Sequence, residues 1–102
     1  MNTSIAYTVS ATFTDCEVAD EWLGWLNSGH IEEVIRGGAT SAEVIHMDGD
    51  DCRYEIRYHF PSREAFQAYE KNHAPRLRAE GLEKFPTSRG VTYARTTGDV
   101  IG

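Results

Sequence analysis

The sequence lacks a long apolar run and lacks the features of an exported protein. No stretch approaches the roughly 18 consecutive apolar residues that a membrane-spanning helix requires, so a transmembrane protein is not expected. The first residues, MNTSIAYTVSATF, contain neither a basic segment nor a continuous apolar segment, so no secretion signal is predicted. We therefore expect a cytoplasmic protein.

Cysteine is scarce, and histidine occurs without the spacing of a metal site. Cys16 and Cys52 lie in different segments and form no CxxC pair, so we expect reduced, partly buried thiols. The four histidines form no HExxH or HxH motif, and His46 and His59 fall on strands whose register the sequence leaves open. Neither a metal ion nor haem or another cofactor is predicted.

Basic residues are too few to predict a polyanionic partner. Ten Lys and Arg stand against sixteen Asp and Glu, which gives a formal net charge of −6. Binding to nucleic acid or to an anionic membrane is driven mainly by clustered Lys and Arg, so neither partner is expected. The acidity names no substrate, and its ordinary effect is to keep a protein soluble.

Linkers, charge blocks and low-complexity segments are also missing. The chain has 102 residues, of which 40% are hydrophobic, and this is enough for one core but not for two. Residues 1–102 are therefore expected to form a single domain.

Four segments have the two-residue periodicity of β-strands. They are residues 5–13, 40–47, 52–60 and 89–96. The third is the clearest, because apolar and aromatic residues from Tyr54 to Phe60 alternate with Arg, Glu and His. Residues 48–51, Asp-Gly-Asp-Asp, predict a hairpin turn between the second and third strands.

A helix is predicted after the first strand. Thr14 and Glu17 fit a capping box, with Thr14 as the N-cap. Apolar residues then recur at helical spacing, until Ser-Gly at residues 28–29 weakens the helix. One or two further turns follow, and Gly-Gly at residues 37–38 ends them.

A second helix is predicted after the third strand. Ser62 is expected to be its N-cap, with Phe66 and Tyr69 on its buried side. Ala-Pro at residues 74–75 interrupts the helix, because the residue before a proline avoids the helical region. A shorter piece follows and is expected to end at Gly81.

The predicted order of elements is βαββαβ. Right-handed crossovers and a hairpin between the second and third strands then give a four-stranded antiparallel sheet with both helices on one face. The expected fold class is therefore α+β, with the ferredoxin-like arrangement.

Two runs of residues resemble the dimeric α+β barrel superfamily. They are Trp22-Leu23-Gly24-Trp25-Leu26 with His30-Ile31 and Gly37-Gly38, and Tyr54, Tyr58, Ser62-Arg63-Glu64-Ala65-Phe66, Tyr69 and His73-Ala74-Pro75-Arg76-Leu77-Arg78. The resemblance covers residues 5–96 and is greatest to a branch of small bacterial proteins classed as a domain of unknown function. Better-known relatives include small antibiotic-biosynthesis-type monooxygenases, isomerases and haem-handling proteins. The resemblance implies a homodimer with a site between helices and sheet or in the barrel, and no particular reaction.

His30 and His73 are the candidate catalytic residues. Each follows a buried helical position by one turn, Leu26 in the first helix and Tyr69 in the second. A ligand-facing imidazole can act as a general base, since it titrates near neutral pH. Alternatively, each imidazole fills a helix end, hydrogen-bonds a freed carbonyl and interacts with the negative end of the helix dipole.

Candidate ligand-binding residues fall on both faces of the predicted sheet. Trp22, Tyr58 and Tyr69 are candidates on the helix side, although such rings more often form core. Arg57 and His59 are candidates on the polar face, where Arg57 is expected to contact a carboxylate or an anionic ligand. The small and charged residues of that face fit either a plain solvated surface or, alternatively, a dimer interface or polar cleft.

Two classes of function remain. The first is a cytoplasmic homodimer that binds or transforms a small apolar or aromatic molecule in the cleft between sheet and helices. The second is a non-catalytic dimeric interaction or structural module. No catalytic set is identified, so no enzyme activity is assigned.

Overall fold

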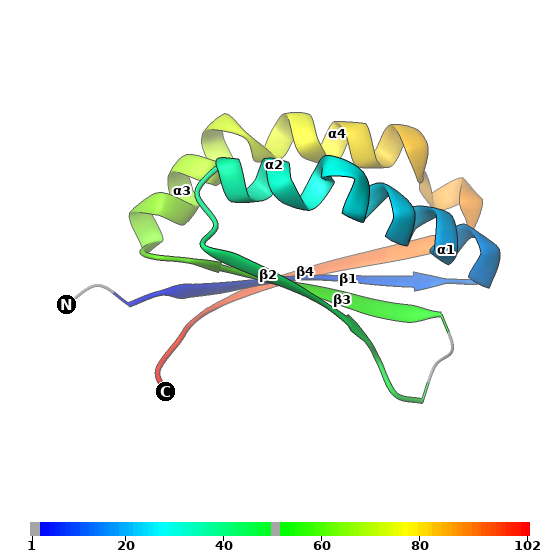
Figure 1. Cartoon of the computed structure of the whole chain (residues 1–102), viewed down its shortest axis with the longest axis horizontal. Helices are drawn as coiled ribbons and strands as arrows, with labels where there is room; N and C mark the ends of the chain where they lie inside the picture. The colour runs from blue at the N-terminus through cyan, green and yellow to red at the C-terminus, as the bar shows by residue number, and fades with distance from the viewer. Residues whose placement is uncertain (1–2, 50–51) are drawn as a thin grey trace.

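The chain alternates strands and helices in the order that its sequence predicts. The computed structural model describes residues 3–49 and 52–102 (Figure 1). In chain order the elements are β1 (Ile5–Phe13), α1 (Cys16–Trp25), the π-helical segment η1 (Leu26–His30), α2 (Ile31–Arg36), β2 (Ser41–His46), β3 (Arg53–Phe60), α3 (Arg63–Asn72), α4 (Ala74–Lys84), the 3-10 helix η2 (Thr87–Arg89) and β4 (Val91–Asp99). The predicted hairpin turn falls partly on residues 50–51, which lie outside the described residues.

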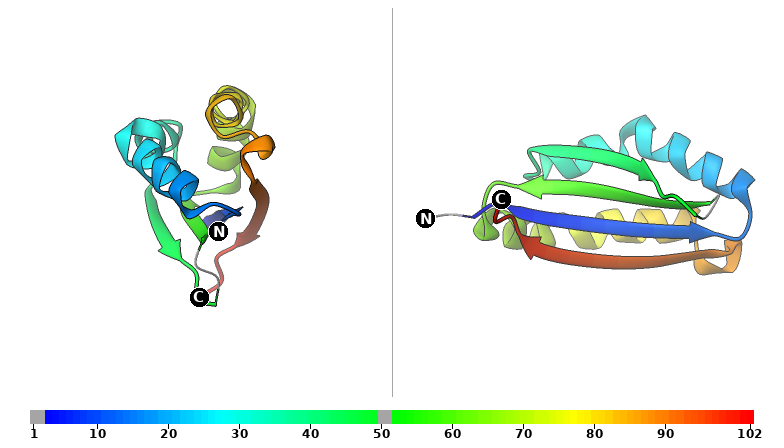
Figure 2. Two further views of the ribbon diagram at one scale, coloured as in Figure 1. Left: turned by 90° about the vertical axis from the view of Figure 1, so that its right-hand side faces the viewer. Right: turned by 90° about the horizontal axis from the view of Figure 1, so that it is seen from below.

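The four strands form one antiparallel sheet in the order β2-β3-β1-β4. The first helical arm (α1, η1 and α2) lies along one half of this sheet, and the second arm (α3 and α4) lies along the other half, on the same face (Figure 2). In the described part of the chain no helix covers the opposite face. This is the ferredoxin-like α+β fold, so the predicted fold class is confirmed.

The strand register assigns each side chain of the sheet to one of two faces. Tyr7 of β1 pairs with Tyr58 of β3, and both belong to the buried apolar cluster under the helices. The next pair, Thr8 and Arg57, points to the other face, because side chains alternate along a strand. We call this second face the open face, and its members include Ala6, Thr8, Ser10, Thr12, Arg53, Glu55, Arg57, His59, Thr92 and Ala94.

The first arm begins and breaks for local chemical reasons. Its N-cap is Asp15, whose Oδ1 accepts the backbone N–H of Glu17 at 2.9 Å. The predicted Thr14 cap is wrong by one residue, because the Thr14 N–H still belongs to the sheet edge and donates to the carbonyl of Gly90. The break falls at Gly29, whose φ of 138° strains residues other than glycine.

The second arm begins as predicted and runs further than predicted. Ser62 caps α3, since its Oγ accepts a backbone N–H of the first turn at 3.1 Å. The break falls at His73, and Pro75 then lies in the first turn of α4, where its missing N–H costs nothing. The helix continues past Gly81, so the predicted end there is wrong. A Cβ at Gly81 would lie 3.3 Å from the Trp25 ring, so this glycine allows a close approach of the two arms.

The helices of the described chain are short compared with a membrane-spanning helix. In the part of the chain that the structure describes, no helix is both long enough and apolar enough to cross a bilayer. The longest, α4, has 11 residues, about half of what a span requires.

The two cysteines form a disulfide, so the prediction of reduced thiols is wrong. Strand pairing is the physical reason. The N–H of Phe13 donates to the carbonyl of Cys52 at 2.9 Å, which holds the end of β1 against the start of β3. Cys16 follows at the start of α1, and its Cα lies 5.4 Å from that of Cys52, within the usual range for a disulfide.

Candidate functional site

A cavity of about 50 Å³ lies between the sheet and the two helical arms. We call it the inner cavity. Aromatic side chains from three strands and both arms line it, namely Tyr7, Trp22, Trp25, Tyr58, Tyr69 and Tyr93. The structure therefore brings three of the predicted ligand-binding residues, Trp22, Tyr58 and Tyr69, to one space.

A larger groove of about 260 Å³ opens on the surface between the first arm and α4. We call it the outer groove, and Ser28, Glu33, Glu80 and Lys84 supply its polar lining. Trp25 and His30 line both the outer groove and the inner cavity. Their rings are stacked, with centroids 4.1 Å apart and planes inclined by 25°. This stacked pair is therefore a wall shared by the two spaces.

His30 is held uncharged at this wall. It is the last residue of η1, and the chain passes from it directly into α2, so it does not end a helix. Burial lowers its pKa to about 4, against the attraction of Glu80 and Glu33, which raises it. Its Nδ1 is buried and has no hydrogen-bond partner among the described residues. The expected bond from this nitrogen to a freed carbonyl is absent there.

Tyr58 contributes a second polar atom without a partner. It lies at the middle of β3 with an exposed fraction of 1%, and its ring stacks on Tyr7 with a centroid distance of 5.9 Å. Its hydroxyl has no hydrogen-bond partner within the described part of the chain. Burial raises the pKa of Tyr58, and the same cause raises the pKa of Tyr69, so both hydroxyls stay protonated.

Arg78 of α4 and Arg95 of β4 are the cations among the described lining residues of the inner cavity, and Arg78 was not among the residues predicted for a site. Its Nη2 donates to Tyr7 Oη and to Glu70 Oε1, each at 3.0 Å. Although burial opposes its charge, these two hydrogen bonds raise the pKa of Arg78 above its ordinary value. Its Nε is buried and lacks a hydrogen-bond partner among residues 3–49 and 52–102.

A signal for Arg78 is present in the sequence. Ala74 and Leu77 are buried on α4, and Gly81 lines the inner cavity. Arg78 follows Ala74 by four residues and precedes Gly81 by three, so it belongs to the same helical stripe. An arginine on a buried stripe is uncommon, and this pattern could have identified it as a candidate.

His73 lies away from the inner cavity, at the junction of α3 and α4. Its N–H donates to the carbonyl of Tyr69 at 2.9 Å, and its own carbonyl accepts the N–H of Leu77 at 3.1 Å. A Cβ at Gly37 would lie 3.1 Å from the His73 ring, so the ring packs against the end of α2. His30 and His73 therefore occupy different environments despite their similar places in the sequence.

Arg57 and His59 lie on the open face, with the sheet between them and the inner cavity. Arg57 Nη2 contacts Glu55 Oε1 at 3.1 Å, so its carboxylate partner comes from its own strand. Glu55 also contacts Arg53, at 3.6 Å. The Nδ1 of His59 lies 3.3 Å from the hydroxyl of Ser41. These residues form a polar cluster on the surface rather than part of the aromatic cavity.

The polar groups of the inner cavity are suited to hydrogen bonding. Tyr58 and Tyr69 keep their hydroxyl protons and can donate hydrogen bonds, and His30 is a neutral, weak base. No group of three or more His, Cys, Asp or Glu within the described ranges is arranged to hold a metal ion. Among its described lining residues there is also no serine, cysteine or lysine that could act as a nucleophile.

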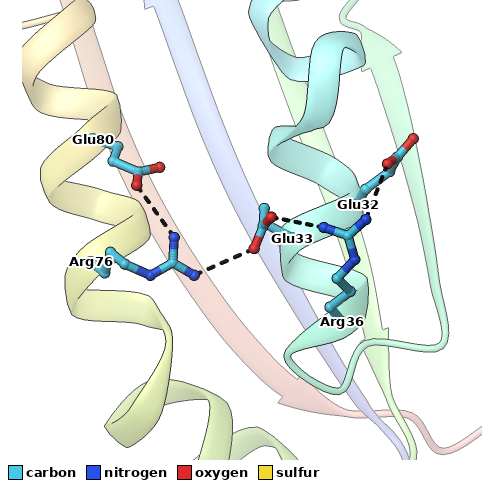
Figure 3. Close-up of polar contacts among 5 residues, drawn as sticks. All are labelled: Glu32, Glu33, Arg36, Arg76 and Glu80. Atoms are coloured by element: carbon cyan, nitrogen blue, oxygen red, sulfur yellow. Dashed lines mark hydrogen bonds and ion pairs between the residues drawn. The ribbon is translucent and has the colours of Figure 1, made fainter.

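Ion pairs join the two arms above the outer groove (Figure 3). Arg76 of α4 contacts Glu80 at 3.3 Å and Glu33 of α2 at 3.4 Å. Arg36 contacts Glu33 at 2.8 Å and Glu32 at 3.9 Å. We call these five residues the clasp. Exposed ion pairs contribute only about 0–1 kcal/mol each, so the clasp offers little resistance to separation of the arms.

Solved structures match this fold over nearly its whole length at low sequence identity. A dimeric ferredoxin-like protein from an uncultured marine organism has a TM-score of 0.71 at 13% identity, over 98% of this chain and 97% of that one. SnoaB, a cofactor-independent oxygenase from Streptomyces nogalater, has a TM-score of 0.70 at 11% identity, over 98% and 95%. A Caulobacter crescentus protein, whose description proposes an antibiotic biosynthesis monooxygenase, has 0.71 at 14%, over 99% and 92%. At these identities the likeness shows the fold alone.

Family membership is shown by sequence. Comparison with curated proteins gives no significant match. A family model described as Domain of unknown function (DUF4286) matches residues 4–97, which is nearly the whole chain. The predicted resemblance to a domain of unknown function with a ferredoxin-like fold is thereby confirmed. The chain belongs to the DUF4286 family.

Proposed function

We propose that the protein is a homodimer in which each subunit binds a small apolar or aromatic molecule between the sheet and the helical arms. One observation carries the proposal. Three side chains that line the aromatic inner cavity, His30, Tyr58 and Arg78, each have a buried polar atom with no partner in the described chain. An unpaired buried polar atom costs about 1–3 kcal/mol, so a ligand that pairs with these atoms recovers that free energy.

The size of the inner cavity constrains how such a ligand is held. Sites for small molecules usually have volumes of roughly 300–1,000 Å³. The inner cavity has about 50 Å³ and the adjoining outer groove about 260 Å³. The proposed ligand therefore occupies both spaces, and Trp25 and His30 move apart to admit it. The weak clasp is consistent with this opening.

The open face supports the homodimer. No helix of the described chain lies over it (Figure 2). Ala6, Thr8 and Ser10 along β1 are small enough to let a second sheet approach. A two-fold axis is the commonest way for one surface to meet itself. Among the structures of the same fold is one described as a dimeric ferredoxin-like protein.

Binding can be tested with the two tryptophans as reporters. Trp22 and Trp25 are the two tryptophans of the chain, and both line the inner cavity. On titration with benzamide, a neutral aromatic probe, we expect both indole N–H signals in a ¹H–¹⁵N NMR spectrum to shift in a saturable manner. Signals that stay unchanged at millimolar benzamide and also at millimolar benzoate, its anionic counterpart, would refute the proposed site.

A cavity-filling variant provides the matched control. Val9 lines the inner cavity, so Val9→Phe should occupy the space and abolish the benzamide shifts. Val44 faces the same side of the sheet from the edge strand β2, outside the cavity lining, so Val44→Phe should bind benzamide like the parent. Equal shifts in both variants would place the probe elsewhere.

The second candidate is a non-catalytic interaction module. The small volume of the inner cavity favours it, because a sheet–helix layer that is nearly filled serves mainly as a core. This candidate predicts a stable dimer that gives no tryptophan shifts with benzamide or other aromatic probes. The same titration therefore separates the two functions.

A further inference from the structure

We infer that the ligand of the inner cavity carries an anionic oxygen, such as a carboxylate, beside its aromatic ring. This inference deepens the proposed function and rests on it. Two of the lining residues, Arg78 and Tyr58, each have a buried donor without an acceptor among the described residues, and none of the described lining residues is Asp or Glu.

Arg78 and Tyr58 supply the unpaired donors. The Nε of Arg78 can only donate a hydrogen bond, and it is buried without an acceptor in the described chain. The hydroxyl of Tyr58 is also buried without a hydrogen-bond partner in the described chain, and its raised pKa keeps its proton available for donation. An oxygen that accepts from both would satisfy two orphaned groups at once.

Arg78 is also held in place before any ligand arrives. Tyr7 and Glu70 both accept from its Nη2, while its Nε–H has no acceptor among the described residues. Glu70 reaches Arg78 from α3 and does not line the cavity. A guanidinium whose orientation is already set loses little entropy on binding an oxygen.

Charge favours an anion over a neutral acceptor. Arg78 and Arg95 both line the inner cavity, and none of its described lining residues is Asp or Glu. Glu70 pairs with Arg78 from outside the lining, so the excess positive charge at the cavity is that of Arg95, while His30 stays neutral. Hydrogen bonds to an ionised acceptor are roughly twice as strong as those between neutral groups.

Benzoate and benzamide test this inference, because they have nearly the same shape and differ in charge. We expect benzoate to bind about tenfold more tightly than benzamide, by the shifts of the Trp22 and Trp25 indole signals at low salt. Equal affinities would overturn the inference and leave the proposed function standing. If neither probe binds, the proposed function itself fails.

Two variants locate the anion. Tyr58→Phe removes the unpaired hydroxyl, so it should lower benzoate affinity about threefold or more while the melting temperature stays equal or rises. Arg78→Met should abolish the preference for benzoate over benzamide. Tyr54→Phe, on the same strand but outside the cavity lining, is the control and should bind both probes like the parent. A benzoate preference that survives both Tyr58→Phe and Arg78→Met would overturn the assignment.

Discussion

Burial keeps His30 uncharged at neutral pH, and its contribution to stability therefore depends on pH. The folded-state pKa is about 4, below the value of 6.5 expected for an unfolded chain. Well above pH 6.5 the imidazole is neutral in both the folded and the unfolded chain, so it does not lower the free energy of unfolding. As the pH falls from 6.5 towards 4, the unfolded chain binds a proton that the folded chain does not, so the free energy of unfolding decreases.

The first prediction concerns this pH range. Between pH 7 and pH 5, His30 should lower the free energy of unfolding by about 1–2 kcal/mol, allowing for its partial exposure. Urea unfolding at the two pH values measures the change. His30→Gln lacks the titrating group, so its loss of stability should be smaller by that amount. A variant that loses as much as the parent would show that His30 is accessible to protons in the folded state.

A matched pair of glycines tests the break in the first arm. Gly29 has a φ of 138° with no atom within 4 Å of an added Cβ, so Gly29→Ala should cost about 1–2 kcal/mol through backbone strain alone. Gly24 lies in α1 with equally open space, so Gly24→Ala should stabilise by about 0.5–1 kcal/mol. Chemical denaturation of both variants measures the two effects. If both substitutions changed the free energy of unfolding in the same direction, the break assigned to Gly29 would be contradicted.

At the scale of elements, the Cys16–Cys52 bridge closes a loop that contains the whole first arm and all of β2. With a sequence separation of 36, loss of this bridge should cost about 3–4 kcal/mol by the chain-entropy relation. A reductant should therefore lower the urea midpoint of the parent protein. The Cys16→Ser variant should unfold at this lower urea midpoint with or without reductant. If a reductant also lowered the midpoint of that variant, loss of the bridge would not be the cause.

The bridge also bears on the predicted cytoplasmic location. Disulfides persist in oxidising compartments and are rare in the cytosol of mesophiles. Alkylation of thiols in intact cells before lysis, followed by measurement of the protein's mass, distinguishes the disulfide-bonded protein from the reduced one. Two alkylated cysteines are expected for a reducing cytoplasm, and none for an oxidising compartment.

Local patterns were sufficient for most elements of this fold. The alternation in β3, the Ser62 cap and the Ser-Gly break at residues 28–29 depend on neighbours in the sequence, and they were predicted correctly. The end of α4 was not, because Gly81 lies inside the helix, where its missing Cβ leaves room for the Trp25 ring, and does not end it. Such a contact joins residues far apart in the chain, and periodicity does not report it.

The candidate site was predictable only in part for the same reason. Trp22, Tyr58 and Tyr69 could be chosen by residue type and helix-side position, and the structure places them around one cavity. His30 and His73 looked alike in the sequence. Their environments differ because of how each arm packs against the sheet, which the sequence pattern does not report. Arg78 was missed because its role depends on Tyr7, 71 residues away.

At the scale of the whole molecule, the open face should decide the oligomeric state. Thr8 lies near its centre, paired with Arg57 on one side and Thr96 on the other. We expect the protein to be a dimer by light scattering after size exclusion, with at least about 1,000 Å² buried in total. Thr8→Arg should shift it to a monomer, because a cation placed beside Arg57 opposes sheet-to-sheet contact. Gln67→Arg, on the exposed side of α3, should leave the dimer intact.

The disulfide has a mechanical consequence as well. When force is applied to the two ends of the chain, the load passes through the bond between Cys16 and Cys52 and bypasses the segment between them. That segment unravels without adding to the end-to-end length. In single-molecule stretching, the oxidised chain should therefore reach a contour length shorter by roughly 120 Å than the reduced chain, at about 3.3–3.6 Å for each shielded residue.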